Sequence, residues 1–580
     1  MAACRESVSL FEPSHAHVSE IFMRSLKALS AVLALGVMPL SAFAQQPVAL
    51  SKVEIVDKIV AQERAEMQVL RQYSPLVETY IQNLRSDEQR GVALDTDKYF
   101  LGRAHLAKGV ELEPLIHSAG NKRNIFGGLQ NFFSTEYVPR GFLQMIFLDE
   151  NGFDREHYNF TYIHREFLGE VRCLVFDVDP LVKGQKGRFV GRIWVEDQDY
   201  HVVRFNGTYN GSSKSSYYFD FDSWRQNAGK NQWLPNFVYS EEGRSQNSST
   251  KNMVPQAFRA QTRLWGYALG HIQEEQELSK ILVETPVKDQ TDAANDYSPL
   301  QAERSWSRLA EDNVASSLER IGLMAPHGDV DKVLETVVNN LEVTNNLDIE
   351  PEVRCRVLMT STLESFTMGH TIVVSRGLMD VLPDEASLAA ILAHELGHVV
   401  LGHRMDTQFA FFSRLRFDEK ETFRHFGFAR TSEEEQAANH KGIELLMQSP
   451  YKDQVRTAQR FLQALQSRSK EIPNLISPHL GDRVPTTWTI TSAVSGAQLS
   501  AATPAANVLS ALPLGGRVKV EPWSDQLQLL KSKPVGAVAE YEKMPFEVGP
   551  FVLYLTRQGG GLSAEAPGAV VAKSDADPKP

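Results

Sequence analysis

The stretch LAAILAHELGHVVL (residues 388–401) decides the fold of its part of the chain. It is apolar on every side except at His394, Glu395 and His398, and a helix that is apolar all round is buried. Pro383-Asp384-Glu385 stands just before it, and Pro followed by acidic residues is typical of a helix start. At about 100° per residue the three polar side chains fall in one sector of the helix. The sequence therefore predicts a buried helix with one polar side.

Two histidines one helical turn apart, with a glutamate after the first, form the pattern HExxH. Buried polar side chains need partners, and two imidazoles at this spacing can share one Zn²⁺ ion. In this pattern the glutamate takes a proton from the water that the metal activates. We therefore predict His394 and His398 as zinc ligands, Glu395 as the general base, and one zinc ion per chain. The alternative is a structural helix whose histidines are ordinary core residues.

The third ligand separates the subclasses of such sites. A metzincin has Gly three residues and His six residues after the second histidine, but this chain has Leu401 and Arg404 there. His403 lies five residues after His398, about 140° around the helix, so we expect it to point elsewhere. A gluzincin instead takes a Glu from a later helix, and the segment SEEEQAANHKG (residues 432–442) offers several.

Two quoted segments resemble a known family. ESFTMGHTIVVSRGLMDVLPDEASLAAILAHELGHVVLGH (residues 364–403), followed by EQAANHKG (residues 435–442), resembles zinc metallopeptidases of the CAAX-prenyl-protease/HtpX type, especially their soluble periplasmic BepA-like members. The resemblance covers roughly residues 305–490. It implies a mainly helical gluzincin domain with a small sheet. The family pattern E-x-x-A-D-x-x-G implies Glu435 as the third zinc ligand.

The chain departs from that family at several positions. Asn439 replaces an Asp that is expected to orient a metal-binding histidine, and His370 stands where the family usually has Gly. In SPHLGDRV, His479 and Arg483 take the places of a downstream His and Arg. The resemblance implies that they make a fourth zinc contact or stabilise the oxyanion; a loop His with a solvated Arg is the alternative. We predict the strand Thr371–Ser375 as the sheet edge to which an extended substrate adds.

From about residue 99 to 283 the hydrophobic pattern has period two, which is typical of strands. Residues 189–195 and 200–205 are predicted strands joined by a turn at 196–199, and Asn206-Gly207 predicts a further hairpin turn. We therefore predict an antiparallel β domain. The stretch GRFVGRIWVEDQDYHVVRFNGTY (residues 187–209) resembles the half-barrels of bacterial lipoprotein-sorting proteins.

The N-terminal region reads as a targeting segment. MRSLK begins at Met23, an apolar run covers 28–38, and the small-residue box Ala-Phe-Ala ends at Ala44, which together are the parts of a secretory signal peptide. Met23 is then the true start, and an N-terminal membrane anchor is the alternative. Later in the chain no uncharged stretch reaches the roughly 20 residues of a membrane span. We predict an exported bacterial protein, periplasmic or secreted.

Composition limits the partners of the chain. Its 580 residues carry 60 Lys+Arg and 72 Asp+Glu, a net charge of −12, which argues against general nucleic-acid binding. Three cysteines are too few for a disulfide framework. We divide the α+β multidomain chain into seven segments: a signal peptide (1–44), a helical lead-in (45–98), the β domain (99–283), a linker (284–304), the zinc metallopeptidase domain (305–490), a C-terminal extension (491–556) and a disordered tail (557–580).

These features favour a zinc endopeptidase that cleaves envelope or misfolded proteins, with protein or peptide substrates. The β domain would bind or present clients, among them envelope proteins or lipoproteins. A chaperone-like or protein-binding module on a weakened metalloprotease fold is the alternative, because Asn439 and His370 depart from the family pattern.

Overall fold

The computed structural model describes most of the chain between residues 51 and 557. The described residues are 51–87, 91–107, 109–115, 139–149, 152–182, 185, 187–210, 219–229, 232–242, 257–267, 299–403, 427–477, 479–483, 518–520, 525–529, 548 and 553–557. From Ile55 onward they belong to one compact unit. The signal peptide, residues 284–298 of the predicted linker and residues 558–580 lie outside the described residues, so those predictions stay predictions. Residues 299–304, also predicted as linker, belong to the helix Pro299–Ile321.

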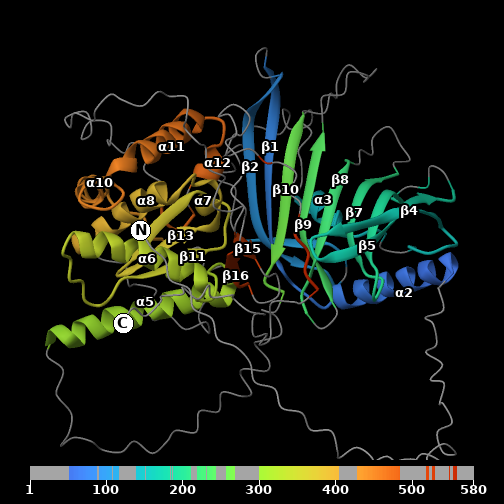
Figure 1. The fold of residues 1–580 in the computed structure, drawn as a ribbon, viewed down its shortest axis with the longest axis horizontal. Helices are drawn as coiled ribbons and strands as arrows, with labels where there is room; N and C mark the ends of the chain where they lie inside the picture. Colours follow the sequence, from blue (N-terminus) through green and yellow to red (C-terminus); the bar gives the residue numbers. More distant parts are fainter. Residues whose placement is uncertain are drawn as a thin grey trace, which may run out of the picture. The chain divides into compact units, whose positions relative to one another are not determined.

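A ten-stranded antiparallel sheet forms the first part of this unit (Figure 1). Its order is β3-β2-β1-β10-β9-β8-β7-β6-β5-β4, so β4 to β10 form a meander and β10 pairs back onto β1. The strands are β1 (Leu76–Asp87), β2 (Gly91–His105), β3 (Glu111–Pro114), β4 (Tyr158–Leu168), β5 (Val171–Pro180), β6 (Phe189–Glu196), β7 (Val202–Tyr209), β8 (Phe221–Asn227), β9 (Trp233–Glu242) and β10 (Phe258–Trp265). The predicted antiparallel β domain is confirmed.

Helix α2 (Lys52–Leu70) joins this sheet through buried ion pairs. Arg225 of β8 makes two hydrogen bonds to Glu63 of α2, at 2.6 and 2.7 Å, and both side chains are buried. Val56, Ile59 and Leu70 of the helix share an apolar cluster with the sheet and with α3 (Pro139–Gln144). Helix α2 therefore covers one face of the ten-stranded sheet.

Two predictions about this region are wrong. We expected the helical lead-in to extend to residue 98, but the helix ends at Leu70 and residues 76–105 form β1 and β2. Buried polar residues such as Glu78 and Gln82 obscure the alternation there. We also expected a turn at Asn206-Gly207, but both residues lie inside β7, opposite Arg192 and Gly191. The glycine serves a close approach instead, since a Cβ on Gly207 would lie 2.7 Å from the Gly191 Cα.

The second part is mainly helical around a small mixed sheet, as predicted (Figure 1). The sheet has the order β11-β13-β12-β14, with a parallel β11–β13 pair. Its strands are β11 (Arg354–Leu358), β12 (Glu364–Met368), β13 (Thr371–Ser375) and β14 (Asp482–Arg483). The helices are α5 (Pro299–Ile321), α6 (Asp329–Thr344), α7 (Arg376–Val381), α8 (Glu385–Val400), α10 (Ser432–Met447), the 3-10 helix η1 (Lys452–Gln454), α11 (Val455–Arg468) and α12 (Pro473–Ile476). A two-stranded sheet of β15 (Val518–Val520) and β16 (Leu527–Leu529) follows.

Strand β13 is not the sheet edge. The segment Thr371–Ser375 was predicted to receive an extended substrate, but β13 pairs with β11 on one side and with β12 on the other. Its backbone groups are therefore already engaged in the sheet. Among the described residues, the strand next to β12 on its other side is the two-residue β14, which pairs with Glu364 and Ser365.

The sheet of ten strands and the helical part share a buried polar junction. The Glu78 carboxylate of β1 accepts hydrogen bonds from the Ser361 amide, the Ser361 hydroxyl and the Tyr99 hydroxyl, at 2.5 to 2.6 Å. Arg376, at the start of α7, lies 3.3 Å from the same carboxylate. Asp97 of β2 accepts the Asn474 and Leu475 amides of α12. The two parts are thus joined through buried, mutually satisfied groups.

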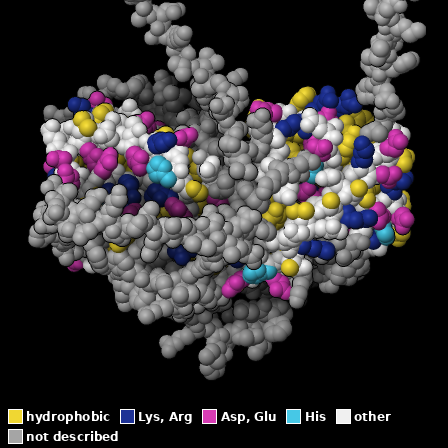
Figure 2. Space-filling model, turned by 90° about the horizontal axis from the view of Figure 1, so that it is seen from below, with side chains coloured by type: hydrophobic (Ala, Val, Ile, Leu, Met, Phe, Trp, Pro, Cys, Tyr) yellow, Lys and Arg dark blue, Asp and Glu magenta, His cyan; other side chains and the backbone are white. Residues whose placement is uncertain are grey.

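Charged side chains of both signs are exposed on one face of the molecule (Figure 2). On the face drawn in Figure 2, Lys and Arg side chains alternate with Asp and Glu side chains rather than gathering in one area. Among the described residues, no helix is both long and apolar enough to span a bilayer.

Candidate metal centre

Helix α8 carries the HExxH residues and forms as the sequence predicts. The Asp384 side chain accepts the Ser387 amide at 2.8 Å and caps the helix, because the first amides of a helix have no partner inside it. Residues 386–399 are all buried. His394, Glu395 and His398 are each 1 % exposed, so three polar groups stand in an apolar environment.

Helix α10 lies against α8 at backbone distance. A Cβ on Gly442 of α10 would lie 2.8 Å from the His394 Cα, and a Cβ on Gly397 of α8 would lie 2.8 Å from the Ala438 carbonyl oxygen. Only glycine fits at both positions. The Thr431 hydroxyl caps α10 and Glu434 closes the capping box, which places Glu435 in the first turn of α10. Close helix packing therefore brings Glu435 to the histidines.

The three predicted ligands converge on one point. His394 Nε2 and His398 Nε2 are 3.3 Å apart. Glu435 Oε2 lies 3.5 Å from His394 Nε2, and Glu435 Oε1 lies 3.3 Å from His398 Nε2. Ligands at about 2.0–2.1 Å from a tetrahedral zinc ion are about 3.3–3.4 Å from one another. The spacing of these donors is that of three corners of a zinc tetrahedron.

The chemistry of the donors also fits a cation. His394, His398 and Glu435 are the group of possible metal ligands found among the described residues. Burial raises the pKa of Glu435, but its bonds to His394 and His398 outweigh burial and hold the pKa well below the usual range. Glu435 is therefore an anion facing two ring nitrogens. Two imidazoles and one carboxylate are a usual donor set for a catalytic zinc site.

Glu395 stands beside these donors with one oxygen held and the other without a hydrogen bond. The Ser365 hydroxyl of β12 donates to Glu395 Oε1 at 2.6 Å, whereas Oε2 is buried without a hydrogen-bond partner. Burial raises the pKa of Glu395 to about 7, against the lowering effects of His398 and of the Ser365 bond. A carboxylate with a pKa near neutrality is suited to take up and return a proton. Sequence reasoning missed Ser365, because no local pattern links it to a residue thirty positions later.

His403 does not point away, as helical geometry had suggested. Its Nδ1 lies 2.8 Å from His398 Nδ1, on the side of that ring opposite the metal-facing Nε2. Helix α8 ends at Val400 and Gly402 has a φ of +68°, so extending the helix to His403 gives the wrong direction. His403 therefore contacts a ligand ring rather than joining the metal group. Ring orientation by such a contact is common at zinc sites.

The other predicted residues remain outside the metal group. The Asn439 Oδ1 is buried without a hydrogen-bond partner in the described structure. His479 stacks on Tyr99 with ring centroids 5.3 Å apart, its amide donates to Glu364, and its Nε2 is buried without a partner. Arg483 pairs through its backbone with Glu364, and its side chain is not among those described. The roles predicted for these three residues stay predictions.

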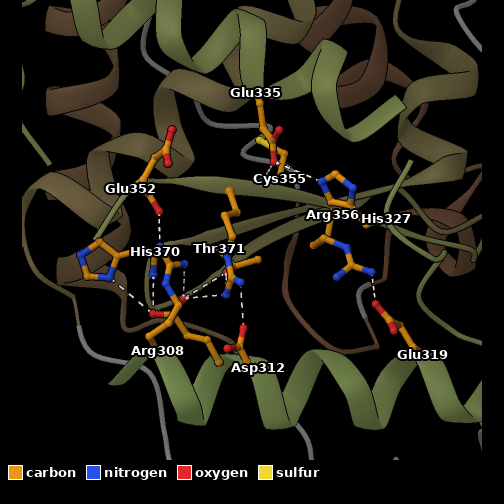
Figure 3. A network of polar contacts seen from close by, with 12 residues as sticks. Arg308, Asp312, Glu319, His327, Glu335, Glu352, Cys355, Arg356, His370 and Thr371 are labelled. Atoms are coloured by element: carbon orange, nitrogen blue, oxygen red, sulfur yellow. Dashed lines mark hydrogen bonds and ion pairs between the residues drawn. The ribbon is translucent and has the colours of Figure 1, made fainter. Parts of the chain in front are cut away.

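His370 belongs to a polar network between the small sheet and α5 (Figure 3). Its backbone amide donates at 3.0 Å to Glu311 of α5, and Thr371 donates to the same carboxylate. Arg308 and Arg354 form ion pairs with Glu311, which is fully buried. The turn before β13 is therefore tied to α5, and His370 stabilises this junction.

Comparison with known proteins bears on this region. Residues 326–479 match the model of Peptidase family M48. The matched stretch is about a quarter of the chain. It contains the HExxH helix and Glu435, the residues on which the sequence resemblance to metallopeptidases rests. The finer resemblance to BepA-like members is not distinguished by this match.

A curated relative is similar to part of the chain. The chain is 33 % identical over 98 residues to the metalloprotease LoiP of Escherichia coli K12, which covers 17 % of this chain and 37 % of that protein. The chain thus spans little more than a third of the relative it matches.

Two solved structures are similar to part of the chain, at low identity and low TM-score. They are a putative outer membrane lipoprotein-sorting protein domain from Vibrio parahaemolyticus and a DUF1329 family protein from Desulfovibrio piger. Both are 11 % identical to this chain and align with 36 % of it. The alignments include 91 % and 90 % of the two solved chains, and the TM-scores are 0.17 and 0.16. At these scores the likeness carries no argument, so the sheet is interpreted from its own residues.

Proposed function

We propose that this chain is a zinc-dependent endopeptidase. The observation that carries the proposal is the convergence of His394, His398 and Glu435 at the spacing of a zinc tetrahedron, with Glu395 buried next to them. A catalytic zinc site with three protein ligands keeps a fourth position for water or substrate. A purely structural site would instead be closed by a fourth protein ligand. Among the described residues the group has three members.

Each residue of the site has a distinct task in peptide hydrolysis. When bound, zinc supplies Lewis-acid polarisation of the scissile carbonyl and lowers the pKa of water. His394, His398 and Glu435 hold the ion. Glu395 takes the proton of the attacking water and returns it to the leaving amine, because its free oxygen is available and its pKa is close to neutrality. Ser365 orients the carboxylate that performs both transfers.

The substrate strand adds along β12 rather than β13 in this proposal. The pairing of β12 with β14 involves only Glu364 and Ser365, so the rest of this side of β12 has no strand partner among the described residues. The Thr367 carbonyl there accepts a hydrogen bond from Arg430 at 3.0 Å. A peptide pairing with β12 would replace this contact. Ser365 then places Glu395 directly behind the strand that receives the peptide.

We further propose that the substrates are envelope or misfolded proteins and that the chain is exported in a bacterial cell. The signal-peptide pattern at residues 23–44 supports export. The antiparallel sheet beside the peptidase part supports a role in binding clients, envelope proteins and lipoproteins among them.

The decisive experiment compares the purified protein with its Glu395→Gln variant on casein and on an unfolded protein. We expect cleavage by the wild type, and loss of at least 1,000-fold in the variant while the zinc content stays at one per chain. Glu433→Gln, in the first turn of α10 but outside the metal group, is the matched control and should cleave normally. Zinc-loaded wild type without cleavage would favour the chaperone-like alternative, whereas a zinc-free protein would favour a structural helix.

A further inference from the structure

Three hairpin turns lie in a row at one end of the ten-stranded sheet. They are the β4–β5 turn at Gly169–Glu170, the β6–β7 turn after Glu196 and the β8–β9 turn after Asn227. In an antiparallel meander, alternate turns fall at the same end of the sheet. The row is therefore a direct result of the strand order.

The C-terminal segment 553–557 crosses this row. The Glu170 amide donates to the Leu555 carbonyl at 2.9 Å, and the Asn227 side-chain amide donates to the Arg557 carbonyl at 2.5 Å. The Arg557 guanidinium lies 2.7 Å from Glu196 and 2.8 Å from Asp197. One segment thus contacts all three turns through two carbonyls and one cation.

The segment is seated closely but is not part of the sheet. Leu555 is fully buried in the apolar cluster that contains Val171 and Cys173 of β5. A Cβ on Gly169 would lie 2.6 Å from the Leu555 amide nitrogen, so this turn is shaped for a passing backbone. Residues 553–557 have no strand pairing in the described structure. They lie on the sheet end as a bound peptide would.

The receiving groups are held in place without the segment. The Glu196 carboxylate, only 1 % exposed, accepts the amides of Gln198, Asp199 and His201 from its own turn. The Asn227 side-chain oxygen accepts the Gly229 amide at 2.8 Å, which fixes the direction of its NH₂ group. Arg557 is therefore a guest at an acidic site that the turns build by themselves.

We infer that this row of turns is a recognition site for extended polypeptide, which segment 553–557 occupies in the free protein. The ligand is a peptide with an apolar residue followed, two positions later, by Arg or Lys. The apolar residue takes the place of Leu555, the cation binds Glu196 and Asp197, and backbone carbonyls accept from Glu170 and Asn227. The site deepens the proposed function, since it puts client recognition on the sheet. It is tested by binding, so failure of cleavage and failure of binding are separate results.

The test uses the full chain and a fluorescein-labelled peptide with the sequence of residues 551–558, FVLYLTRQ. Arg557→Glu in the chain repels the segment from the acidic pair. We expect this variant to bind the peptide at least tenfold more tightly than the wild type, measured by fluorescence anisotropy. Arg155→Glu is the matched control, because Arg155 pairs with Asp57 on α2 and not with the turns. It should bind like the wild type.

A charge exchange locates the site. The double variant Arg557→Gln, Asp197→Lys has no charge at position 557 to hold the segment in place, and it should prefer a peptide with Glu in place of its Arg, whereas the single variant Arg557→Glu should prefer Arg. Should the single variant lack the wild-type thermal transition, Arg557→Gln, which removes only the charge, replaces it. Equal affinity of the wild type and the charge variant, or equal affinity for the Arg and Glu peptides, would overturn the inference.

Discussion

Ser365 and Glu395 join the small sheet to the HExxH helix through one hydrogen bond of 2.6 Å between two buried side chains. Ser365 lies next to Glu364 on β12, and Glu364 accepts the amides of residues 479–481. These two successive residues of β12 therefore have different structural roles. One fixes the loop after α12, and the other fixes the proton-transferring carboxylate.

Replacing Ser365 by Ala should lower kcat about tenfold or more with little change in KM. A hydrogen bond to a charged group contributes about 1.5–3 kcal/mol, and this one favours the ionised carboxylate. Its loss raises the pKa of Glu395 further, so the acidic limb of the pH–kcat profile should move to higher pH. The control is Ser387→Ala on α8, the helix that carries Glu395, because the buried Ser387 hydroxyl has no hydrogen-bond partner. An unchanged profile in Ser365→Ala would remove Ser365 from the mechanism.

Zinc binding should depend on Glu435 and not on its neighbour. Glu435→Ala removes one of three donors, so the metal content of the purified protein should fall far below one per chain and activity should be lost. Glu434→Ala removes only the capping-box bond, a loss of about 1 kcal/mol, and should keep its zinc. Elemental analysis of both variants checks this. Full zinc occupancy in Glu435→Ala would exclude Glu435 as a ligand.

Gly442→Ala should loosen the metal centre without changing any donor. The added Cβ meets the His394 Cα at 2.8 Å, so α10 must move away from α8 and carry Glu435 with it. Overpacking of this kind typically costs about 1–3 kcal/mol. We expect a lower melting temperature and weaker zinc affinity in a chelator competition. Gly427→Ala, where a Cβ meets nothing within 4 Å, should leave zinc affinity unchanged.

Asp331 should make the protein less stable as the pH rises from about 4 to 6. Burial raises the pKa of Asp331 from 3.8 to about 6, so in this range the folded chain holds a proton that the unfolded chain has lost. The free energy of unfolding therefore falls with rising pH, by roughly 2 kcal/mol at most. Asp331→Asn keeps an acceptor for the Gly328 amide and removes the charge.

The free energy of unfolding of Asp331→Asn should consequently exceed that of the wild type by more at pH 7 than at pH 4 in urea titrations. Asp329→Asn, an exposed residue in the same turn, supplies the comparison. The same difference at both pH values would show that Asp331 does not titrate abnormally.

The sequence alone predicts the metal centre because its signals are local. The spacing of His394 and His398 on an apolar helix, and the E-x-x-A pattern from Glu435, each occupy a few consecutive residues. Ser365 and the C-terminal segment act across long sequence separations, so no window of residues reveals them. His403 shows a related failure: a helical projection is valid only while the helix lasts, and α8 ends three residues earlier.

The sheet was harder to place for a different reason. Strand β1 is buried on both faces from Leu76 to Leu84, and β1 and β2 carry buried polar residues such as Gln82 and Asp97, so the apolar-polar alternation that identifies a half-exposed strand is weak there. The hairpin from β6 to β7 has a clear alternation and was located correctly. Its Asn-Gly pair nevertheless lies within a strand, because Gly191 and Gly207 pack against each other.

The junction at Glu78 sets a limit on modularity. If the peptidase part were excised at residue 305, the Ser361 amide and hydroxyl and the Arg376 guanidinium would lose the carboxylate that they share. A buried donor that is left without its acceptor destabilises the fold by more free energy than its hydrogen bond had contributed. We therefore expect that the stretch matched by the family, residues 326–479, does not fold independently of the ten-stranded sheet. The ten-stranded sheet and the helical part should therefore unfold in one cooperative transition.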